Sequence, residues 1–390
     1  MNIAILIQTL GGGGAERVAQ IIGDYYVEKG NNVYYFLGDT PVEQVYPVKG
    51  KVVNTGIKGC VSDSSDKDIK ALAKLIKASF RMRKCKKKYK IDVAVSFIEE
   101  FNYLNVLSRG REKVITRVCT VVSKCSAYSG ILYHKAVVSF FYNLADKVVV
   151  LSEDARYDMH QNYKIALNKM VKIPNIALSV PACDSQIDWE YGDKVIVTVG
   201  RLSPQKQQER IIRAFSYVNK HEKAARLLIL GVGQKEKYLK GLCERYDLKE
   251  SVIFAGFKSN VGDYLRRSKV FVLASEVEGM SNGMMEAMAY GLPVVTTAAP
   301  GACSEIVGRK KSLEACKDIE YCPYGILIPY ITGAVRSSSE LEREELLLGK
   351  AMLELLNNDA LREKYSKRSI KRASMYNLES IMKKWERILK

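Results

Sequence analysis

Two glutamates, Glu278 and Glu286, stand on either side of the junction between a predicted apolar strand, Val270–Leu273, and a predicted apolar helix, Asn282–Tyr290. Backbone N–H groups at the start of a helix are unpaired and attract anions, so a diphosphate could bind at this junction. A carboxylate inside the helix could accept hydrogen bonds from both hydroxyls of a ribose. These residues alone fit equally well an exposed loop acid and a second acid that only complements the helix dipole.

The backbone between the two glutamates could complete such a site. Its candidate residues are Gly279, Met280, Ser281, Asn282 and Gly283. A second candidate segment, with Gly200, Arg201 and Lys206, follows the strand predicted over Lys194–Val199. Its cations could hold a diphosphate and stabilise it as a leaving group without a metal ion. A solvated basic turn is the alternative, and on this segment alone it is favoured.

A glycine-rich segment, Gly12, Gly13 and Gly14, connects the first predicted strand to the helix predicted over Ala15–Lys29. Glycines let a ligand approach the backbone closely, and the helix start attracts anions. The segment lacks a complete G-x-G-x-x-G pattern, and no acid at the end of the second strand is placed to bind a dinucleotide ribose. A nicotinamide cofactor is therefore not expected. A flexible turn is the alternative.

A basic amphipathic helix is predicted across Lys70–Lys90, just after Asp66-Lys67-Asp68. Its apolar positions are Ile69, Leu72, Leu75, Ile76 and Phe80. The helix could bind an anionic membrane face, where each basic residue contributes about 1 kcal/mol. It could equally be a surface helix that packs through its apolar residues. Helix capping explains the two aspartates better than a metal site does, and no metal is expected.

Length and composition limit the classes of protein. The chain has 390 residues, which favours two domains, and its net charge of +18 favours an anionic partner such as nucleic acid, anionic lipid or a phosphorylated substrate. The nine cysteines form no C-x-x-C pair, so neither a zinc site nor a disulfide framework is expected. The first residues lack the features of a signal peptide, and no apolar run is long enough to span a membrane. We expect a cytoplasmic protein.

Short apolar strands alternate with longer helices along most of the chain, which indicates parallel doubly wound sheets. The pattern breaks over Pro174–Asp193, which we interpret as an interdomain linker, and restarts at Lys194. Two such α/β domains in tandem predict a ligand cleft between them, at the carboxyl ends of the strands.

Taken together, these segments resemble the family 4 glycosyltransferases, which are retaining, metal-independent enzymes with two Rossmann-like domains, the GT-B fold. The resemblance spans nearly the whole chain, and it is most specific in the second half. The matching motifs are Gly12-Gly13-Gly14-Ala15-Glu16-Arg17, Ile173-Pro174-Asn175, Gly200-Arg201-Leu202 with Lys206, Gly231-Val232-Gly233, and Glu278 with Glu286 followed by Ala287-Met288-Ala289 and Gly291.

The resemblance implies that the chain has three parts. They are an acceptor-binding domain over residues 1–178, a nucleotide-sugar-binding domain over 179–372, and a final helix over 373–390 that crosses back to the first domain.

The resemblance also implies roles for the candidate donor residues. Glu286 would bind the nucleotide ribose, and Glu278 the hydroxyls of the transferred sugar. Arg201 and Lys206 would hold the diphosphate, with the glycine-rich segment of the first domain completing the phosphate site. Phe254 would lie at the edge of the base.

One departure concerns the acceptor side. Related enzymes often carry a histidine after a strand in the middle of the first domain, and this chain has none there. Arg117, Cys119 or Thr120 would line the acceptor side instead.

The sequence therefore predicts a retaining transferase without a cofactor. It would move a hexose or N-acetylhexosamine from a nucleotide-diphosphate sugar, with UDP favoured, to a lipid-linked or polysaccharide glycan. A polyprenyl-diphosphate acceptor and a peripheral position on the inner face of the cell membrane fit the basic helix. A nucleotide-sugar epimerase of the same fold stays open, as does a non-catalytic protein that binds anions or nucleic acid. Nucleic acid is not the favoured partner, because no aromatic RNA-binding motif occurs.

Overall fold

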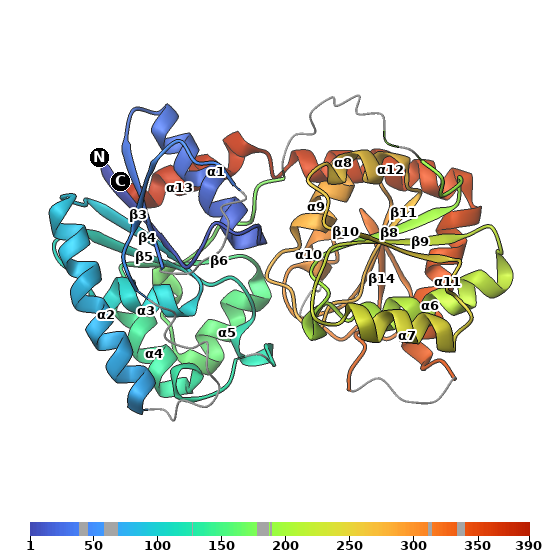
Figure 1. The fold of residues 1–390 in the computed structure, drawn as a ribbon, viewed down its shortest axis with the longest axis horizontal. Helices are drawn as coiled ribbons and strands as arrows, with labels where there is room; N and C mark the ends of the chain where they lie inside the picture. The colour runs from blue at the N-terminus through green and yellow to red at the C-terminus, as the bar shows by residue number, and fades with distance from the viewer. Residues whose placement is uncertain are drawn as a thin grey trace. The chain divides into compact units, whose positions relative to one another are not determined.

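A computed structural model describes residues 1–38, 46–57, 69–126, 128–177, 187, 189–310, 314–333 and 340–390. The chain divides into two compact units (Figure 1). Unit 1 contains Met1–Asn175 together with Ile381–Lys390, and unit 2 contains Ile176–Ser380. Asp66-Lys67-Asp68 lies outside the described residues.

Unit 1 is built on one parallel sheet. Within the described residues its strand order is β3-β2-β1-β4-β5-β6-β7, and every neighbouring pair is parallel. The strands are β1 (Asn2–Ile7), β2 (Asn32–Leu37), β3 (Lys51–Asn54), β4 (Val93–Phe97), β5 (Lys113–Arg117), β6 (Lys147–Val150) and β7 (Met170–Lys172). Strand β4 is buried along its whole length, as expected for a central strand with helices on both faces.

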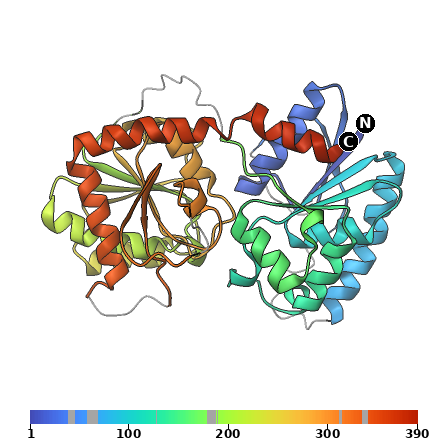
Figure 2. The same ribbon diagram turned by 180° about the vertical axis from the view of Figure 1, so that it is seen from behind.

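The helices of unit 1 cover both faces of this sheet. They are α1 (Gly14–Glu28), α2 (Ile69–Lys88), α3 (Glu99–Leu107), α4 (Lys135–Leu144), α5 (Glu153–Tyr163) and α13 (Leu378–Leu389). Helices α1 and α13 lie on one face, and α2 to α5 on the other (Figures 1 and 2). The Tyr25 hydroxyl of α1 donates to Glu386 of α13 at 2.7 Å, and Trp385 is buried. The final helix of the chain therefore belongs to the first unit.

Unit 2 repeats the architecture. Its order among the described residues is β10-β9-β8-β11-β12-β14-β13, parallel except for the β13–β14 pair. The strands are β8 (Val195–Val199), β9 (Arg226–Leu230), β10 (Val252–Gly256), β11 (Val270–Leu273), β12 (Val294–Thr297), β13 (Glu320–Cys322) and β14 (Gly325–Ile328).

The helices of unit 2 also form two layers. They are α6 (Gln208–His221), α7 (Glu236–Arg245), α8 (Val261–Arg267), α9 (Asn282–Ala289), α10 (Cys303–Ile306), α11 (Arg343–Asn357) and α12 (Asp359–Ser374). Helices α6, α7 and α11 lie on one face of the sheet, and α8, α9 and α12 on the other (Figure 1).

A buried charge cluster joins α6 to α11, because Glu345 accepts from Arg210 at 2.8 Å and from Arg213 at 2.8 and 2.9 Å. Each buried charge therefore has an opposite charge beside it.

Candidate functional site

The candidate donor site lies where the strand order of unit 2 reverses. Strand β8 has β9 on one side and β11 on the other, and ligands bind at such switch points, outside the carboxyl ends of the strands. Hydrogen bonds join the loops that follow β8 and β11: Gln205 Nε2 donates to Val277 O at 3.1 Å, and Glu276 N donates to Gln205 O at 2.8 Å. The fold thus brings together two segments that the sequence separates by about seventy residues.

Glu278 and Lys206 form an ion pair at this junction. Glu278 is buried at 5% exposure, and its Oε1 also accepts from Ser275 Oγ at 2.7 Å. A buried carboxylate requires such partners, because removing its charge from water is costly. Two residues predicted to bind adjacent parts of the donor, the diphosphate and the transferred sugar, are therefore in direct contact.

The backbone of Glu278 is also fixed. Its N–H donates to Pro300 O at 3.0 Å, and its carbonyl accepts from Ala302 N at 3.3 Å. Gly301, at φ +123°, lies directly against that carbonyl, where a Cβ would collide with it. A side chain at residue 301 would displace the Glu278 loop.

Helix α9 begins at the end of the same loop. Ser281 is its N-cap, and the Ser281 hydroxyl accepts from Met284 N at 3.3 Å. A Cβ on Gly283 would lie 3.2 Å from Val199 O, so this glycine lets the helix start approach the end of β8. Glu286 lies one turn further along α9 and is half-buried. Gly279, Met280 and Ser281 are buried, whereas Asn282 and Gly283 are half-buried.

The remaining residues after β8 are held by the neighbouring loop. Gly200 N donates to Leu230 O at 2.9 Å, and the exposed Arg201 has its carbonyl bound by Gln208 Nε2 at 2.9 Å. Gly231 lies so close to Gly200 that a Cβ on Gly231 would collide with the carbonyl oxygen of Gly200. The Gly231-Val232-Gly233 motif therefore shapes this loop through close packing.

Phe254 and Phe257 differ in position. Phe254 lies within β10 and packs against the hydrophobic core of unit 2. Phe257 follows the carboxyl end of β10 and is 57% exposed. Phe254 is therefore partly buried by core packing, whereas more than half of Phe257 is exposed.

The predicted glycine segment of unit 1 carries a carboxylate beside it. Helix α1 begins at Gly14, with Gly13 as its N-cap, and Gly12 has φ +100°. The Glu16 carboxylate lies directly against Gly13. An anion at this loop would meet that negative charge as well as the helix start.

The structure brings together the three predicted acceptor-side residues at the end of β5. Arg117 is 2% exposed; its Nη1 donates to Cys119 Sγ at 3.2 Å, and its Nη2 donates to Asn175 Oδ1. Burial lowers the pKa of Arg117 and raises the pKa of the Cys119 thiol. Thr120 is also buried. The Asn175 of the Ile173-Pro174-Asn175 motif thus anchors Arg117.

Sequence reasoning missed a buried acid beside these residues. Glu99 is fully buried at the start of α3, and its Oε2 accepts from the Tyr128 hydroxyl at 2.5 Å. Burial raises the pKa of Glu99 to about 7. An acid two residues after the apolar strand Val93–Phe97 was the available signal.

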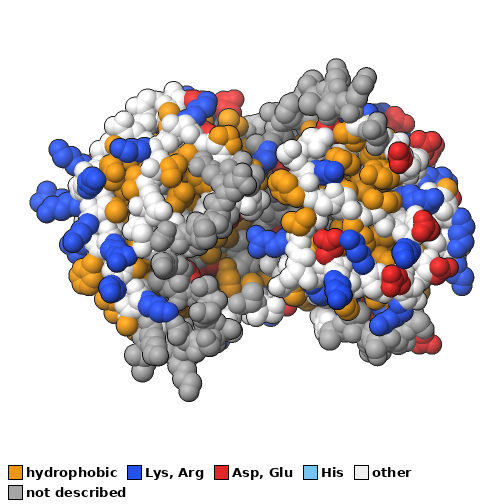
Figure 3. All heavy atoms as spheres, viewed as in Figure 1, with side chains coloured by type: hydrophobic (Ala, Val, Ile, Leu, Met, Phe, Trp, Pro, Cys, Tyr) orange, Lys and Arg blue, Asp and Glu red, His pale blue; other side chains and the backbone are white. Residues whose placement is uncertain are grey.

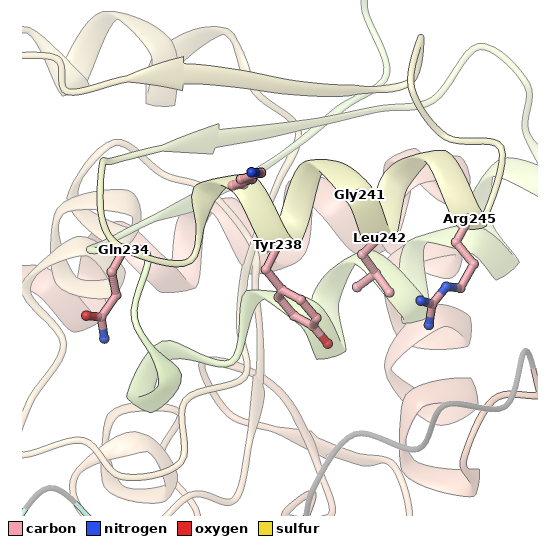
Figure 4. A pocket seen from close by; sticks show the side chains of 6 residues that line it. Gln234, Tyr238, Gly241, Leu242 and Arg245 are labelled. Atoms are coloured by element: carbon pink, nitrogen blue, oxygen red, sulfur yellow. The ribbon is translucent and has the colours of Figure 1, made fainter.

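The described part of the chain contains no group of three or more His, Cys, Asp and Glu side chains placed to hold a metal ion. An open groove of about 500 Å³ lies along α7, and none of the residues that line it is a predicted site residue (Figure 4). Its lining residues are Gln234, Lys237, Tyr238, Gly241, Leu242 and Arg245.

Comparison with known protein families identifies part of unit 2. The family described as "Glycosyl transferases group 1" matches residues 183–320. Residues 183–320 form a glycosyl transferases group 1 domain. This glycosyltransferase domain contains the two loops, the Lys206–Glu278 ion pair and Glu286.

The similarity to known relatives extends over both units of the chain. An uncharacterized glycosyltransferase, MJ1059 of Methanocaldococcus jannaschii, is 26% identical over 339 residues, covering 81% of this chain and 83% of the relative. The N-acetylgalactosamine-N,N'-diacetylbacillosaminyl-diphospho-undecaprenol 4-alpha-N-acetylgalactosaminyltransferase of Campylobacter jejuni is 25% identical over 382 residues, covering 96% of each protein.

Solved structures show the fold. Sucrose-phosphate synthase from Thermosynechococcus elongatus has a TM-score of 0.79 at 17% identity, covering 99% of this chain and 98% of that one. Anabaena Alr3699/HepE in complex with UDP and glucose has a TM-score of 0.72 at 16% identity, covering 100% and 99%. The expected GT-B fold, with two Rossmann-like domains, is confirmed.

Proposed function

We propose that this glycosyltransferase moves a hexose or N-acetylhexosamine from a UDP-sugar to a lipid-linked or polysaccharide glycan, with retention of the donor's anomeric configuration. The observation that carries the proposal is the meeting of Lys206, Glu278 and the start of α9 at the switch point of unit 2. The name of the Campylobacter relative describes a lipid-linked acceptor, and the Anabaena structure holds UDP and glucose. Both support the choice of substrates.

The proposed roles follow from position and charge. Arg201 and Lys206 hold the diphosphate and stabilise its charge as the sugar leaves, together with the backbone N–H groups at the start of α9. Glu286, on the following turn, accepts hydrogen bonds from the ribose hydroxyls. Glu278 accepts hydrogen bonds from the transferred sugar. In this assignment Lys206 exchanges part of its contact with Glu278 for the donor phosphate.

We further propose that α2 holds the protein on the inner face of the cell membrane. The apolar residues Leu72, Ile76 and Phe80 are four positions apart and exposed, with Phe80 at 64%. Exposed cations follow on the same helix: Lys74, Lys77, Arg81, Arg83, Lys84, Lys87 and Lys88. Figure 3 shows Lys and Arg side chains gathered along the outer edge of unit 1. Anionic lipid fits both features.

A nucleotide screen tests the donor site. Full-length protein is titrated with UDP, GDP and ADP, and unfolding temperature and dissociation constant are measured for wild type, Glu286→Ala and the control Glu244→Ala on exposed α7. We expect UDP to stabilise wild type and the control, and Glu286→Ala to weaken binding roughly 10- to 100-fold, the loss expected for charge-assisted hydrogen bonds. Equal UDP binding by all three proteins would contradict the assignment of Glu286.

A further inference from the structure

Glu99 lies at the edge of the unit 1 sheet where ligands bind in doubly wound folds. Strands β4 and β5 are parallel neighbours, with Phe97 opposite Arg117, so both carboxyl ends reach the same edge. Glu99 follows β4 there, and Cys119 and Thr120 follow β5. Arg117 Nη1 donates to Cys119 Sγ at 3.2 Å, and the charge of Glu99 also acts on this thiol, so Cys119 lies near both groups.

A strained backbone holds Glu99 in this position. Ile98, the residue between β4 and α3, has φ +69° and ψ 146°. A β-branched side chain rarely adopts positive φ, and such conformations persist only where the surrounding structure enforces them, often at functional sites. The turn makes Glu99 the first residue of α3.

The Glu99 carboxylate has one satisfied oxygen and one unsatisfied oxygen. Tyr128 donates to Oε2 at 2.5 Å, whereas Oε1 is buried without a hydrogen-bond partner in the described structure. Other buried glutamates in the described residues are paired with cations, as Glu112 is with Lys86 and Glu345 with Arg210. A buried acceptor without a partner is unusual and calls for a specific explanation.

Two polar groups that can donate hydrogen bonds but have no partner among the described residues lie at the same edge of the unit 1 sheet. Arg117 Nε and Thr120 Oγ1 are buried without hydrogen-bond partners in the described part of the chain. A sugar hydroxyl donates and accepts at once, so adjacent hydroxyls of one sugar could satisfy both Glu99 and these groups. A phosphate fits less well, because the Glu99 carboxylate would repel it.

We propose that Glu99 binds a hydroxyl of the acceptor sugar at the carboxyl ends of β4 and β5. The inference rests on the proposed function and adds the first contact with the acceptor. Tyr128 stacks on Tyr133 with ring centroids 4.4 Å apart, and the Tyr128 hydroxyl is the group that donates to Glu99. The sugar reaches the carboxylate when the Tyr128 ring moves aside and exchanges its hydrogen bond for one from the sugar.

The test separates acceptor binding from donor binding and from folding. The acceptor used as a probe is the one in the name of the Campylobacter relative, N-acetylgalactosamine-N,N'-diacetylbacillosaminyl-diphospho-undecaprenol. The variants are Glu99→Ala, Glu99→Gln and the neighbouring control Glu100→Gln. We expect the KM for this acceptor to rise at least 30-fold in Glu99→Ala and about tenfold in Glu99→Gln, the loss of a charge-assisted hydrogen bond. The UDP dissociation constant stays within twofold of wild type, and Glu100→Gln behaves as wild type.

Two results would overturn the proposal. One is a folded Glu99→Ala protein whose acceptor KM stays within twofold of wild type. The other is a parallel loss of UDP affinity, acceptor affinity and unfolding temperature, which would make Glu99 a structural residue. Wild-type protein that binds UDP but transfers sugar to no acceptor would refute the proposed function itself, and with it this role for Glu99.

Discussion

At the scale of single residues, the proposed donor site depends on the Lys206–Glu278 ion pair. Breaking a buried pair leaves a charge without its partner, whereas an exposed pair contributes little. The Lys206 side chain is 23% exposed and that of Glu278 is 7% exposed. We therefore expect this pair to contribute more to stability than an exposed pair does, and less than a fully buried pair does. The exposed pair of Lys240 and Glu236 on α7 provides a matched comparison.

Lys206→Met should lower the free energy of unfolding by about 1–3 kcal/mol, because Glu278 stays buried beside Ser275 alone. The double variant Lys206→Met/Glu278→Gln should recover part of that loss, whereas Lys240→Met should cost about 0.5 kcal/mol or less. Urea unfolding of the four proteins measures these values. Equal losses in Lys206→Met and Lys240→Met would show that the contact does not stabilise the fold.

The sequence identified these residues but did not predict their contact. Residue types and the spacing of Glu278 from Glu286 favoured a ligand site, yet Lys206 and Glu278 meet only because β8 and β11 are neighbours in the sheet. Glu99 was missed for a related reason. An acid at a helix start has an ordinary explanation in the helix dipole, and only its burial beneath Tyr128 makes it unusual.

At the scale of elements, α2 shows what periodicity predicts and what it leaves open. The helix lies where the sequence placed it. The idea that it packs through its apolar positions is wrong for three of them, since Leu72, Ile76 and Phe80 are exposed. The packed face contains the predicted Leu75 with Ala78 and Met82, together with a cation, Lys86.

Lys86 lies on that buried face because it has partners there. Its Nζ donates to Glu112 Oε1 at 2.8 Å and to Asn105 Oδ1 at 2.7 Å. A lysine can therefore occupy the packed side of a helix when a carboxylate faces it. Residue type alone does not show that this cation is buried.

Two other elements were not predicted, each for a physical reason. Helix α3 is buried on nearly every side, so its sequence carries no amphipathic period. Strand β13, which pairs antiparallel with β14, has only three residues. Three residues are too few to show an alternation of apolar and polar side chains. Residues 131–144 contain η2 (Ile131–Tyr133) and α4, and His134 is the N-cap of α4.

The exposed row on α2 should be required for membrane binding. Replacing Leu72, Ile76 and Phe80 together with serine should weaken binding to phosphatidylglycerol-containing vesicles roughly 10- to 100-fold, because apolar burial in the lipid is lost. Ile370→Ser, an exposed isoleucine on α12, should bind as wild type does. Co-sedimentation at two salt concentrations measures this. Unchanged binding by the triple variant would remove α2 as the anchor.

At the scale of the whole molecule, the alternation of strands and helices predicted both sheets, because each parallel strand needs a crossover helix. The structure divides the chain at 175/176 and 380/381, whereas the sequence placed these limits at 178/179 and 372/373. Asn175 binds Arg117 of unit 1, and Ala177 N donates to Tyr376 O of unit 2 at 2.9 Å. The tertiary contacts that fix these limits are not visible in composition.

The charge of the whole molecule fits the proposed substrates and surface. A net charge of +18 attracts diphosphates and anionic lipid alike, and no helix in the described residues is long and apolar enough to cross a membrane. Net charge limits the class of partner, whereas the proposed donor site in unit 2 and the proposed acceptor site in unit 1 determine which substrates bind. Sugar transfer itself is therefore the activity to measure.

The most direct test follows a radiolabelled sugar from UDP-N-acetylhexosamines and UDP-hexoses into undecaprenyl-diphosphate-linked glycan, with wild type, Glu286→Ala and Glu244→Ala. One donor should label the lipid fraction and release UDP in equal amounts. Glu286→Ala should be at least tenfold slower at low donor concentration, and the control should match wild type. Conversion of the donor to an isomer without acceptor, or an intact donor after long incubation, would contradict the account.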